Sequence, residues 1–320
     1  IYLTPSHIDA DPNFVTKVLD GKLDYAYTKT YADVQALQGV EGVTVTPVSV
    51  LYTRWISFNQ FNQSKNGYSG DNLLADVRVR QAIAHALDRE LICQQVFGGA
   101  ADPGDGTLTP TGTAWKVDGL EAYEYNPEKA KQLLAEAGWD SNRVLTMGYY
   151  YTDQTTQDLV AIMQQMLAAV GIQIEGWLIE GDTATLLNTM PGDATDDARL
   201  DPTSVSNVKW DLCYAALAAT SFHNYYDRFS SVYGVNNSAP TNPELDAMID
   251  KLMTSPSVED QKAAYAELEK WQAENLYIMP MYYQPIWLVT TDKISHNLDL
   301  ENLGNPQFDW DMGWHNWTLK

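Results

Sequence analysis

The side chains that most often perform catalysis form no recognisable catalytic pattern in this sequence. No Gly-x-Ser-x-Gly, His-Glu-x-x-His, Walker A or Gly-x-Gly-x-x-Gly string occurs, and the nearest to the first, residues 67–71, lacks the final glycine. The histidines are scattered without the i, i+4 spacing of a zinc helix, at His7, His85, His223, His296 and His315. His85 falls in a predicted helix, where a packed residue is a better interpretation than a metal ligand. Nothing here specifically indicates an enzyme.

Carboxylates are abundant, with 42 Asp and Glu against 20 Lys and Arg. Among so many, pairs will lie near one another by chance, so a glycosidase-like pair has no specific support. An Asp-rich stretch comprises Asp193, Asp196, Asp197 and Asp201. Its spacing differs from that of an EF-hand loop, so we interpret residues 181–208 as a solvated insertion, and a metal at residues 193–201 stays an open alternative.

The formal net charge of −22 restricts the class of partner. Phosphate backbones and anionic membrane surfaces attract basic patches, so nucleic acid and such membranes are disfavoured. Solubility is the ordinary explanation of the acidity. No apolar run approaches the roughly 18 residues that span a bilayer.

Two cysteines, Cys93 and Cys213, stand far apart, each within an apolar run. Their number and spacing exclude a zinc knuckle or a CxxC redox site. Two buried free thiols are the expected state, while a single disulfide between them stays open.

Aromatic residues are the other group that could form a site, with 10 Trp and 19 Tyr. Most of them are expected in the core. Trp55, Tyr282 and Tyr283 fall near the ends of predicted strands. Because small-ligand pockets are rich in aromatic side chains and favour domain interfaces, these three are candidates for ligand contact as well as for packing.

The elements that would position these residues begin with an amphipathic helix pair over residues 76–97, whose apolar residues recur at helical spacing. Asp76 and Asp88 are placed to cap the two helices, and Gly98 supplies an ending. Other signals predict helices over residues 12–20, 127–137, 159–170, 243–253 and 258–275. Alternating or apolar runs predict strands over residues 42–47, 48–59, 144–151, 172–177, 210–218 and 277–290. The strands flanking helix 159–170 should be parallel.

Two of these segments closely resemble the signatures of a known family. Arg78-Val-Arg-Gln-Ala-Ile-Ala-His-Ala-Leu-Asp-Arg89 and Asn126-Pro-Glu-Lys-Ala-Lys-Gln-Leu-Leu-Ala-Glu-Ala-Gly138 are similar to motifs of the family 5 extracellular solute-binding proteins, the oligopeptide- and dipeptide-binding components of ABC importers. The resemblance runs from the turn at residues 21–24 to the segment at residues 280–283.

The resemblance implies an α/β, periplasmic-binding-protein-like (type II) fold of two lobes. Residues 58–281 would form the second α/β lobe completely. Residues 1–57 and 282–320 would form the C-terminal part of the first lobe and the hinge crossings, with the hinge near residues 55–59. The chain begins at Ile1 and is shorter than known members, so we expect it to be the C-terminal part of a larger protein. Its tryptophan-rich tail should pack on the first lobe.

The implied activity is capture of an oligopeptide in the cleft between the lobes and its delivery to ABC permease subunits. The protein would act outside the cytoplasm, as a monomer attached by a lipid or free in the periplasm, without a cofactor or catalytic activity. Two alternatives stay open: an oligosaccharide-binding member of the same family, and a secreted hydrolase domain.

The resemblance also indicates where ligand would be bound, at Arg54, Trp55, Asn59, Leu217, Thr220, Ser221 and Tyr283. In peptide-binding members an Asp after the strand similar to residues 210–219 takes the ligand's α-ammonium group. That position falls on Thr220 here, and an aromatic position before it falls on Leu217. A hydroxyl cannot balance a desolvated positive charge, so either another carboxylate does so or the ligand has no free amino terminus.

Overall fold

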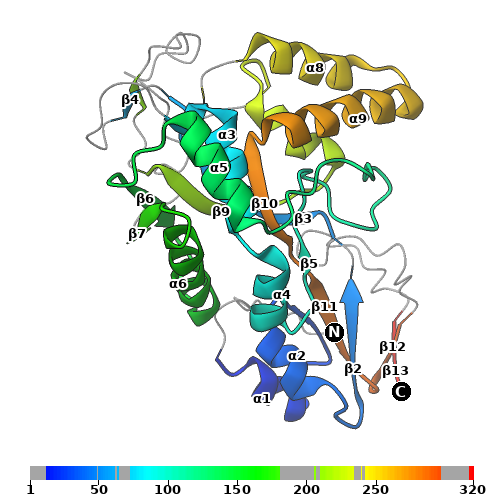
Figure 1. Cartoon of the computed structure of the whole chain (residues 1–320). Helices are drawn as coiled ribbons and strands as arrows, with labels where there is room; N and C mark the ends of the chain where they lie inside the picture. The colour runs from blue at the N-terminus through cyan, green and yellow to red at the C-terminus, as the bar shows by residue number, and fades with distance from the viewer. Residues whose placement is uncertain are drawn as a thin grey trace.

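Two β-sheets of different size organise the chain (Figure 1). The computed structural model describes residues 12–48, 50–61, 63–64, 73–180, 205–206, 210–233, 239, 242–296 and 317–320. Their strands are β1 (Tyr25–Thr28), β2 (Val43–Val48), β3 (Tyr52–Phe58), β5 (Asp102–Pro103), β6 (Val144–Tyr149), β7 (Gln173–Leu178), β9 (Leu212–Ala218), β10 (Ile278–Tyr283) and β11 (Ile286–Thr291). The larger sheet has the order β5-β10-β3-β9-β6-β7 and the smaller one the order β1-β11-β2.

The helices largely follow the predicted capping signals. They are α1 (Phe14–Leu19), α2 (Tyr31–Leu37), α3 (Val77–Ala86), α4 (Arg89–Phe97), α5 (Pro127–Ala137), α6 (Gln154–Ala168), α8 (Pro243–Thr254) and α9 (Val258–Asn275), with 3-10 turns η2 (Leu73–Ala75), η4 (Phe222–Tyr225) and η5 (Asp227–Phe229). The side chains of Asp76 and Asp88 accept hydrogen bonds from the first turns of α3 and α4, which confirms both caps. Helix α2 was not predicted, and α1 begins after Asn13 rather than with Pro12 at its first position.

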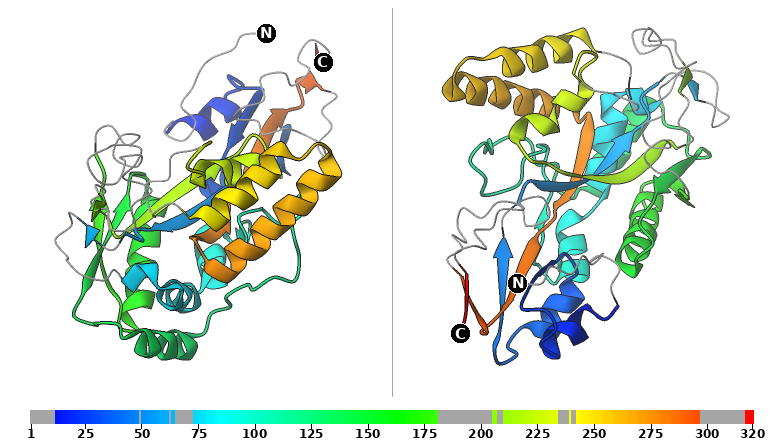
Figure 2. Two further views of the ribbon diagram at one scale, coloured as in Figure 1. Left: turned by 90° about the horizontal axis from the view of Figure 1, so that it is seen from above. Right: turned by 180° about the vertical axis from the view of Figure 1, so that it is seen from behind.

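Helices cover both faces of the six-stranded sheet (Figures 1 and 2). Because successive strand residues point to opposite faces, Ile56 of β3 lies on one face and Trp55 on the other. Ile56 belongs to the core cluster that includes buried residues of α3, α4, α5 and α6. Trp55 belongs to a second cluster with buried residues of α8 and α9. We call these sides of the sheet the α3–α6 face and the α8–α9 face.

The strand–helix–strand unit was predicted correctly. Strands β6 and β7 pair in parallel from Val144 opposite Gln173 to Tyr149 opposite Leu178, with α6 between them in the chain. Strand β9, predicted to be central, lies between β3 and β6 and is parallel to β6.

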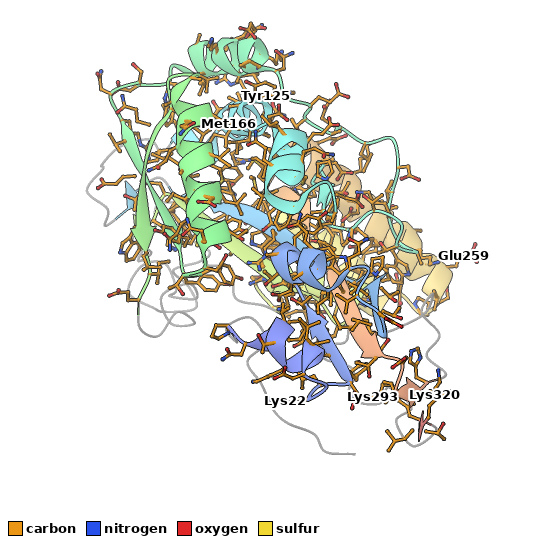
Figure 3. The ribbon with its side chains drawn as sticks, turned by 90° about the horizontal axis from the view of Figure 1, so that it is seen from below. Lys22, Tyr125, Met166, Glu259, Lys293 and Lys320 are labelled. Atoms are coloured by element: carbon orange, nitrogen blue, oxygen red, sulfur yellow. The ribbon has the colours of Figure 1, made fainter. Side chains whose placement is uncertain are left out.

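The three-stranded sheet packs against α1 and α2 through a separate small cluster, to which Phe14, Leu37 and Val289 contribute. At its outer end lie Lys22 and Lys293 (Figure 3). Beside it, β12 (Ile294–Ser295) pairs with β13 (Thr318–Leu319), and the ring of Trp317 meets that of Tyr25 edge-on at 5.0 Å. This contact places Trp317 on the three-stranded sheet, as expected, while the other tail tryptophans lie outside the described residues. A further parallel pair joins β4 (Gln63–Ser64) to β8 (Val205–Ser206).

Two predicted long strands are divided in the structure. Segment 48–59 contains the end of β2 and all of β3, and segment 277–290 contains β10 and most of β11. Strands β2 and β11 pair with each other in the small sheet, whereas β3 and β10 pair in the large one. The chain thus passes twice between the sheets, and the crossings are adjacent, because the backbone N–H of Gln284 donates to the carbonyl of Tyr52 at 2.8 Å.

Candidate functional site

The end of the six-stranded sheet from which the two crossings leave also collects the carboxyl ends of several strands. Tyr52, at the start of β3, pairs with Ala218 at the end of β9, and Thr53 pairs with Tyr283 at the end of β10. Strands β6 and β7 run parallel to β9 and end on the same side. Ligands of α/β proteins bind outside the carboxyl ends of strands and at domain interfaces. We call this end of the sheet the junction.

Arg54 is the charged residue at the junction on the α3–α6 face. Its guanidinium carbon lies 4.2 Å from the ring centroid of Tyr151, 5.2 Å from that of Tyr52 and 5.9 Å from that of Tyr214. Its Nε donates to Gln284 Oε1 at 3.3 Å. The side chain is partly exposed, but Nη1 is buried and has no hydrogen-bond partner among the described residues.

The tyrosine hydroxyls around Arg54 bond to one another. Those of Tyr214 and Tyr282 are 2.6 Å apart, and those of Tyr150 and Tyr151 are 2.7 Å apart. Burial raises the pKa of Tyr282 to about 12, so the phenol stays neutral at ordinary pH. The surroundings of Arg54 are therefore aromatic and polar but carry no negative charge.

Trp55, Leu217 and Tyr283 share the α8–α9 face, opposite Arg54. Leu217 and Tyr283 both pair with Thr53, so they lie on either side of β3. Trp55 is 2% exposed, and its ring lies under the guanidinium of Arg228 at 5.1 Å. The sheet thus brings these predicted residues close together, while Arg54 reaches the junction from the other face.

Asn59 and Tyr283 already have partners within the fold. Asn59 lies just beyond the opposite end of β3, fully buried, and its side chain donates to the carbonyl of Trp210. The hydroxyl of Tyr283 donates to Asp105 and to the carbonyl of Thr107. It lies 3.1 Å from the ammonium of Lys116, which also contacts Asp105 at 2.6 Å. These bonds fix the loop after β5 against β10.

Thr220 and Ser221 follow β9 directly, as the resemblance implies. Both backbone N–H groups and the Thr220 hydroxyl donate to Oδ1 of Asn224. Asn224 in turn donates to Asp227. Thr220 is exposed, and this Asn224-centred turn shapes the loop without placing a carboxylate at residue 220.

Several junction residues were not singled out from the sequence. They are Tyr52, Tyr150, Tyr151, Tyr214, Arg228 and Gln284. A signal existed for two of them, because Tyr150 and Tyr151 end the predicted strand 144–151. The sequence gives no such signal for Arg228, because it lies within the short 3-10 turn η5, whose position depends on tertiary contacts.

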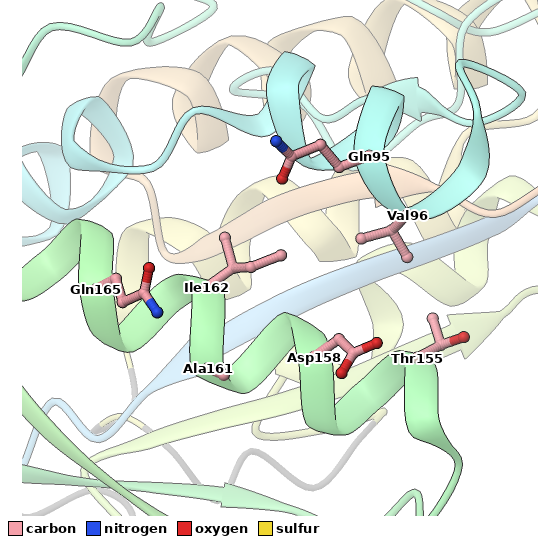
Figure 4. A pocket seen from close by; sticks show the side chains of 7 residues that line it. All are labelled: Gln95, Val96, Thr155, Asp158, Ala161, Ile162 and Gln165. Atoms are coloured by element: carbon pink, nitrogen blue, oxygen red, sulfur yellow. The ribbon is translucent and has the colours of Figure 1, made fainter.

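A separate groove of about 390 Å³ lies between α4 and α6 (Figure 4). It is lined by Gln95, Val96, Thr155, Asp158, Ala161, Ile162 and Gln165. None of the predicted site residues belongs to it.

No group of three or more His, Cys, Asp or Glu side chains that could hold a metal occurs among the described residues. The Asp-rich stretch at residues 193–201 lies outside them. Within the described part of the chain, no helix is long and apolar enough to cross a membrane.

Comparison with known sequences identifies the relatives. The family described as bacterial extracellular solute-binding proteins, family 5 middle, matches residues 6–231. A provisionally named ABC transporter peptide-binding protein of Brucella ovis is 30% identical over 210 residues, which are 62% of this chain and 38% of that protein. The oligopeptide-binding protein AppA of Bacillus subtilis is 25% identical over 256 residues, 75% of this chain and 42% of AppA. The matches thus span less than half the length of these relatives.

Solved structures confirm the predicted fold class. Bacillus subtilis AppA, solved in complex with a nonapeptide, superposes with a TM-score of 0.69 at 20% identity, covering 96% of this chain and 58% of that one. The ABC transporter substrate-binding protein CtaP of Listeria monocytogenes gives 0.71 at 19% identity, covering 89% and 54%. The family match covers most of the chain and agrees with both motifs identified above. The chain therefore belongs to the bacterial extracellular solute-binding proteins of family 5.

Proposed function

We propose that the protein is the solute-binding component of an ABC importer, which captures peptides outside the cytoplasm and delivers them to permease subunits. Membership of family 5 supports binding rather than catalysis. The name of the relative AppA, an oligopeptide-binding protein, favours peptides as the ligand class. The protein acts as a monomer, held at the cell surface by a lipid or free in the periplasm, and needs no cofactor.

The observation that carries this proposal is the pair of adjacent crossings between the sheets. We assign residues 58–281 to the second lobe, but the pairing adds β3 and the end of β10 to its sheet, so the hinge lies before residue 52 rather than near residues 55–59. The remainder of residues 1–57 and 282–320 supplies the end of the first lobe and the crossings. Strand β3 contributes its hydrogen bonds to the six-stranded sheet, so the bend lies between Val48 and Tyr52 and at Gln284. Two short neighbouring segments that absorb a rotation are typical of hinge closure around a ligand.

Calorimetry on the whole protein that contains this chain tests the proposal. Free-amino peptides, their N-acetylated forms and oligosaccharides of similar size serve as probes. We expect peptides to bind and to be recovered intact. Since residue 220 is a Thr, N-acetylation should weaken binding little. Binding of oligosaccharides alone would replace the peptide assignment, and cleavage of any probe would indicate a hydrolase instead.

A further inference from the structure

Arg80 and Arg89 are buried, whereas Arg54 is partly exposed, and their surroundings differ. Arg80 donates to four backbone carbonyls, and Arg89 donates to three. Both are therefore neutralised by peptide dipoles within the fold. Arg54 makes one hydrogen bond within the described residues, through Nε, and leaves Nη1 without an acceptor. Arg80 and Arg89 are thus structural residues, whereas Arg54 has donors that the described fold does not use.

Arg54 has no acidic partner among the described residues. The chain carries 42 acidic against 20 basic residues, yet no carboxylate of the described residues lies within ion-pair distance of Arg54. Besides Gln284, the neighbouring groups are neutral phenol rings, which attract a cation through their faces. A second guanidinium, that of Arg228, lies over the ring of Trp55 on the α8–α9 face and also forms no ion pair with a described residue. The junction therefore has cationic groups without matching anions.

The location of Arg54 suits a ligand contact. It is the third residue of β3, opposite Ala216 near the end of β9 and Tyr282 near the end of β10. Alanine at residue 216 leaves the neighbouring strand position small. The Arg54 side chain keeps part of its surface accessible at the end of the sheet where the crossings leave. Nε is bonded to Gln284 and Nη1 is buried, so a carboxylate reaches the accessible part of the guanidinium through one charge-assisted hydrogen bond, and a second bond to Nη1 requires the surrounding rings to move.

We propose that Arg54 is the anchor for a carboxylate of the bound ligand, which makes the protein selective for peptides that present a negative group at the junction. This inference rests on the proposed function and specifies its ligand. The carboxylate comes from the peptide's C-terminus or from an acidic side chain, and both present the same chemistry to Arg54.

The test measures affinities of the whole protein by calorimetry. The probes are peptides of one sequence with a free or an amidated C-terminus, each with Glu or Gln at one position. We expect the wild-type protein to favour one carboxylate by about 10- to 100-fold, in the range of a charge-assisted hydrogen-bonded pair. Loss upon amidation identifies the C-terminus, and loss upon the Glu-to-Gln change identifies the side chain. Arg54→Gln should abolish the preference, and Arg54→Lys should keep part of it.

Arg78→Gln is the matched control, because Arg78 is 45% exposed and pairs with Asp76 on the surface. It should leave the preference unchanged. Arg54→Gln also removes the hydrogen bond to Gln284 and the contacts with the tyrosine rings, so the Tm of the unliganded protein should fall, and Arg54→Lys, which keeps a cation at the rings, controls for this loss.

Two results would overturn the inference while leaving peptide binding intact. One is equal affinity of the wild-type protein for all four peptides, and the other is an equal loss for all four in Arg54→Gln. Failure of every peptide to bind would instead reject the proposed function. In that case, thermal shift with small carboxylic acids and with their amides tests Arg54. The acids should stabilise the wild-type protein more than the amides do, and Arg54→Gln should abolish this difference.

Discussion

Glu269 of α9 is a carboxyl group without access to solvent. One oxygen accepts a hydrogen bond from the hydroxyl of Tyr226 at 2.7 Å, and the other has no hydrogen-bond partner among the described residues. Burial raises the pKa of Glu269 above its ordinary value of 4.5. Because the folded-state pKa is higher than the unfolded one, the folded state is favoured at low pH, and that stability is lost as the pH rises through the folded pKa.

Glu269→Gln should therefore raise the Tm at about pH 8 and change it little at about pH 4, where both states are protonated. Thermal unfolding followed by circular dichroism across this pH range measures the effect. Glu41→Gln, at an exposed turn, is the control and should leave the Tm unchanged at both pH values. If the Tm of Glu269→Gln were lower than that of the wild-type protein by the same amount at both pH values, Glu269 would be stabilising, and the prediction would be wrong.

The two cysteines are a case in which residue-level reasoning from the sequence succeeded. Both are free and buried. Cys93 packs in the cluster on the α3–α6 face, while Cys213 belongs to a cluster with Trp210 and Ile179. Burial raises the pKa of Cys93 to about 12 and that of Cys213 further. Apolar neighbours in the sequence predicted the burial, but excluding a disulfide required knowledge of which cluster each helix or strand joins.

Neither thiol should react with a thiol-specific disulfide reagent at neutral pH in the native state, because thiolate is the reactive form. Both should react after denaturation without a reductant. Absorbance of the released thiolate measures this. Rapid titration of one cysteine in the native protein would contradict the structure.

Arg80 connects two elements that are distant in the sequence. Its guanidinium donates to the carbonyls of Asn275 and Leu276, at the end of α9, and to two carbonyls of η2. Although burial lowers the pKa of Arg80 to about 10, the side chain stays charged at neutral pH. The signature around Arg80 identified the family, but its spacing could not show this role, because two of its partners lie almost 200 residues later.

Arg80→Met should lower the free energy of unfolding by about 3 kcal/mol or more, because four carbonyls, two of them in buried hydrogen bonds, lose their donor. Urea denaturation measures this loss. Arg78→Met is the matched control on the same helix and should cost much less than Arg80→Met, since exposed ion pairs contribute little. Similar losses for both variants would contradict the capping of α9 by Arg80.

Element bounds were predictable where a local signal marks them. Helices α8 and α9 begin after Asn242 and Ser257, each of which accepts hydrogen bonds from the first turn, so capping residues set their starts. The predicted strand 48–59 failed because its alternation continues past Val48, where the pairing partner changes from β11 to β10 and β9. The pairing partners of a strand lie far away in the sequence, so the sequence of the strand alone does not predict them.

At the scale of the whole molecule, the two largest core clusters are contained within a continuous part of the chain. Every buried member lies between Trp55 and Tyr282. The buried members of the clusters of the three-stranded sheet instead lie before position 53 or after position 285, and Ala216 and Ala218 of β9 pack against one of these clusters. The resemblance predicted two lobes, but only the pairing shows that β3 belongs to the large sheet, where it joins β10 to β9.

A fragment of residues 50–284 should consequently fold without the rest of the chain, whereas a fragment of residues 58–281 should not. The shorter fragment lacks β3, so β10 and β9 lose their shared neighbour and the backbone groups that paired with it become unsatisfied. Thermal unfolding of both fragments, followed by circular dichroism, decides the matter. The longer one should unfold in a cooperative transition and the shorter one should show none. Cooperative unfolding of both fragments would mean that β3 is dispensable. If neither fragment unfolded cooperatively, the large sheet would require the small one.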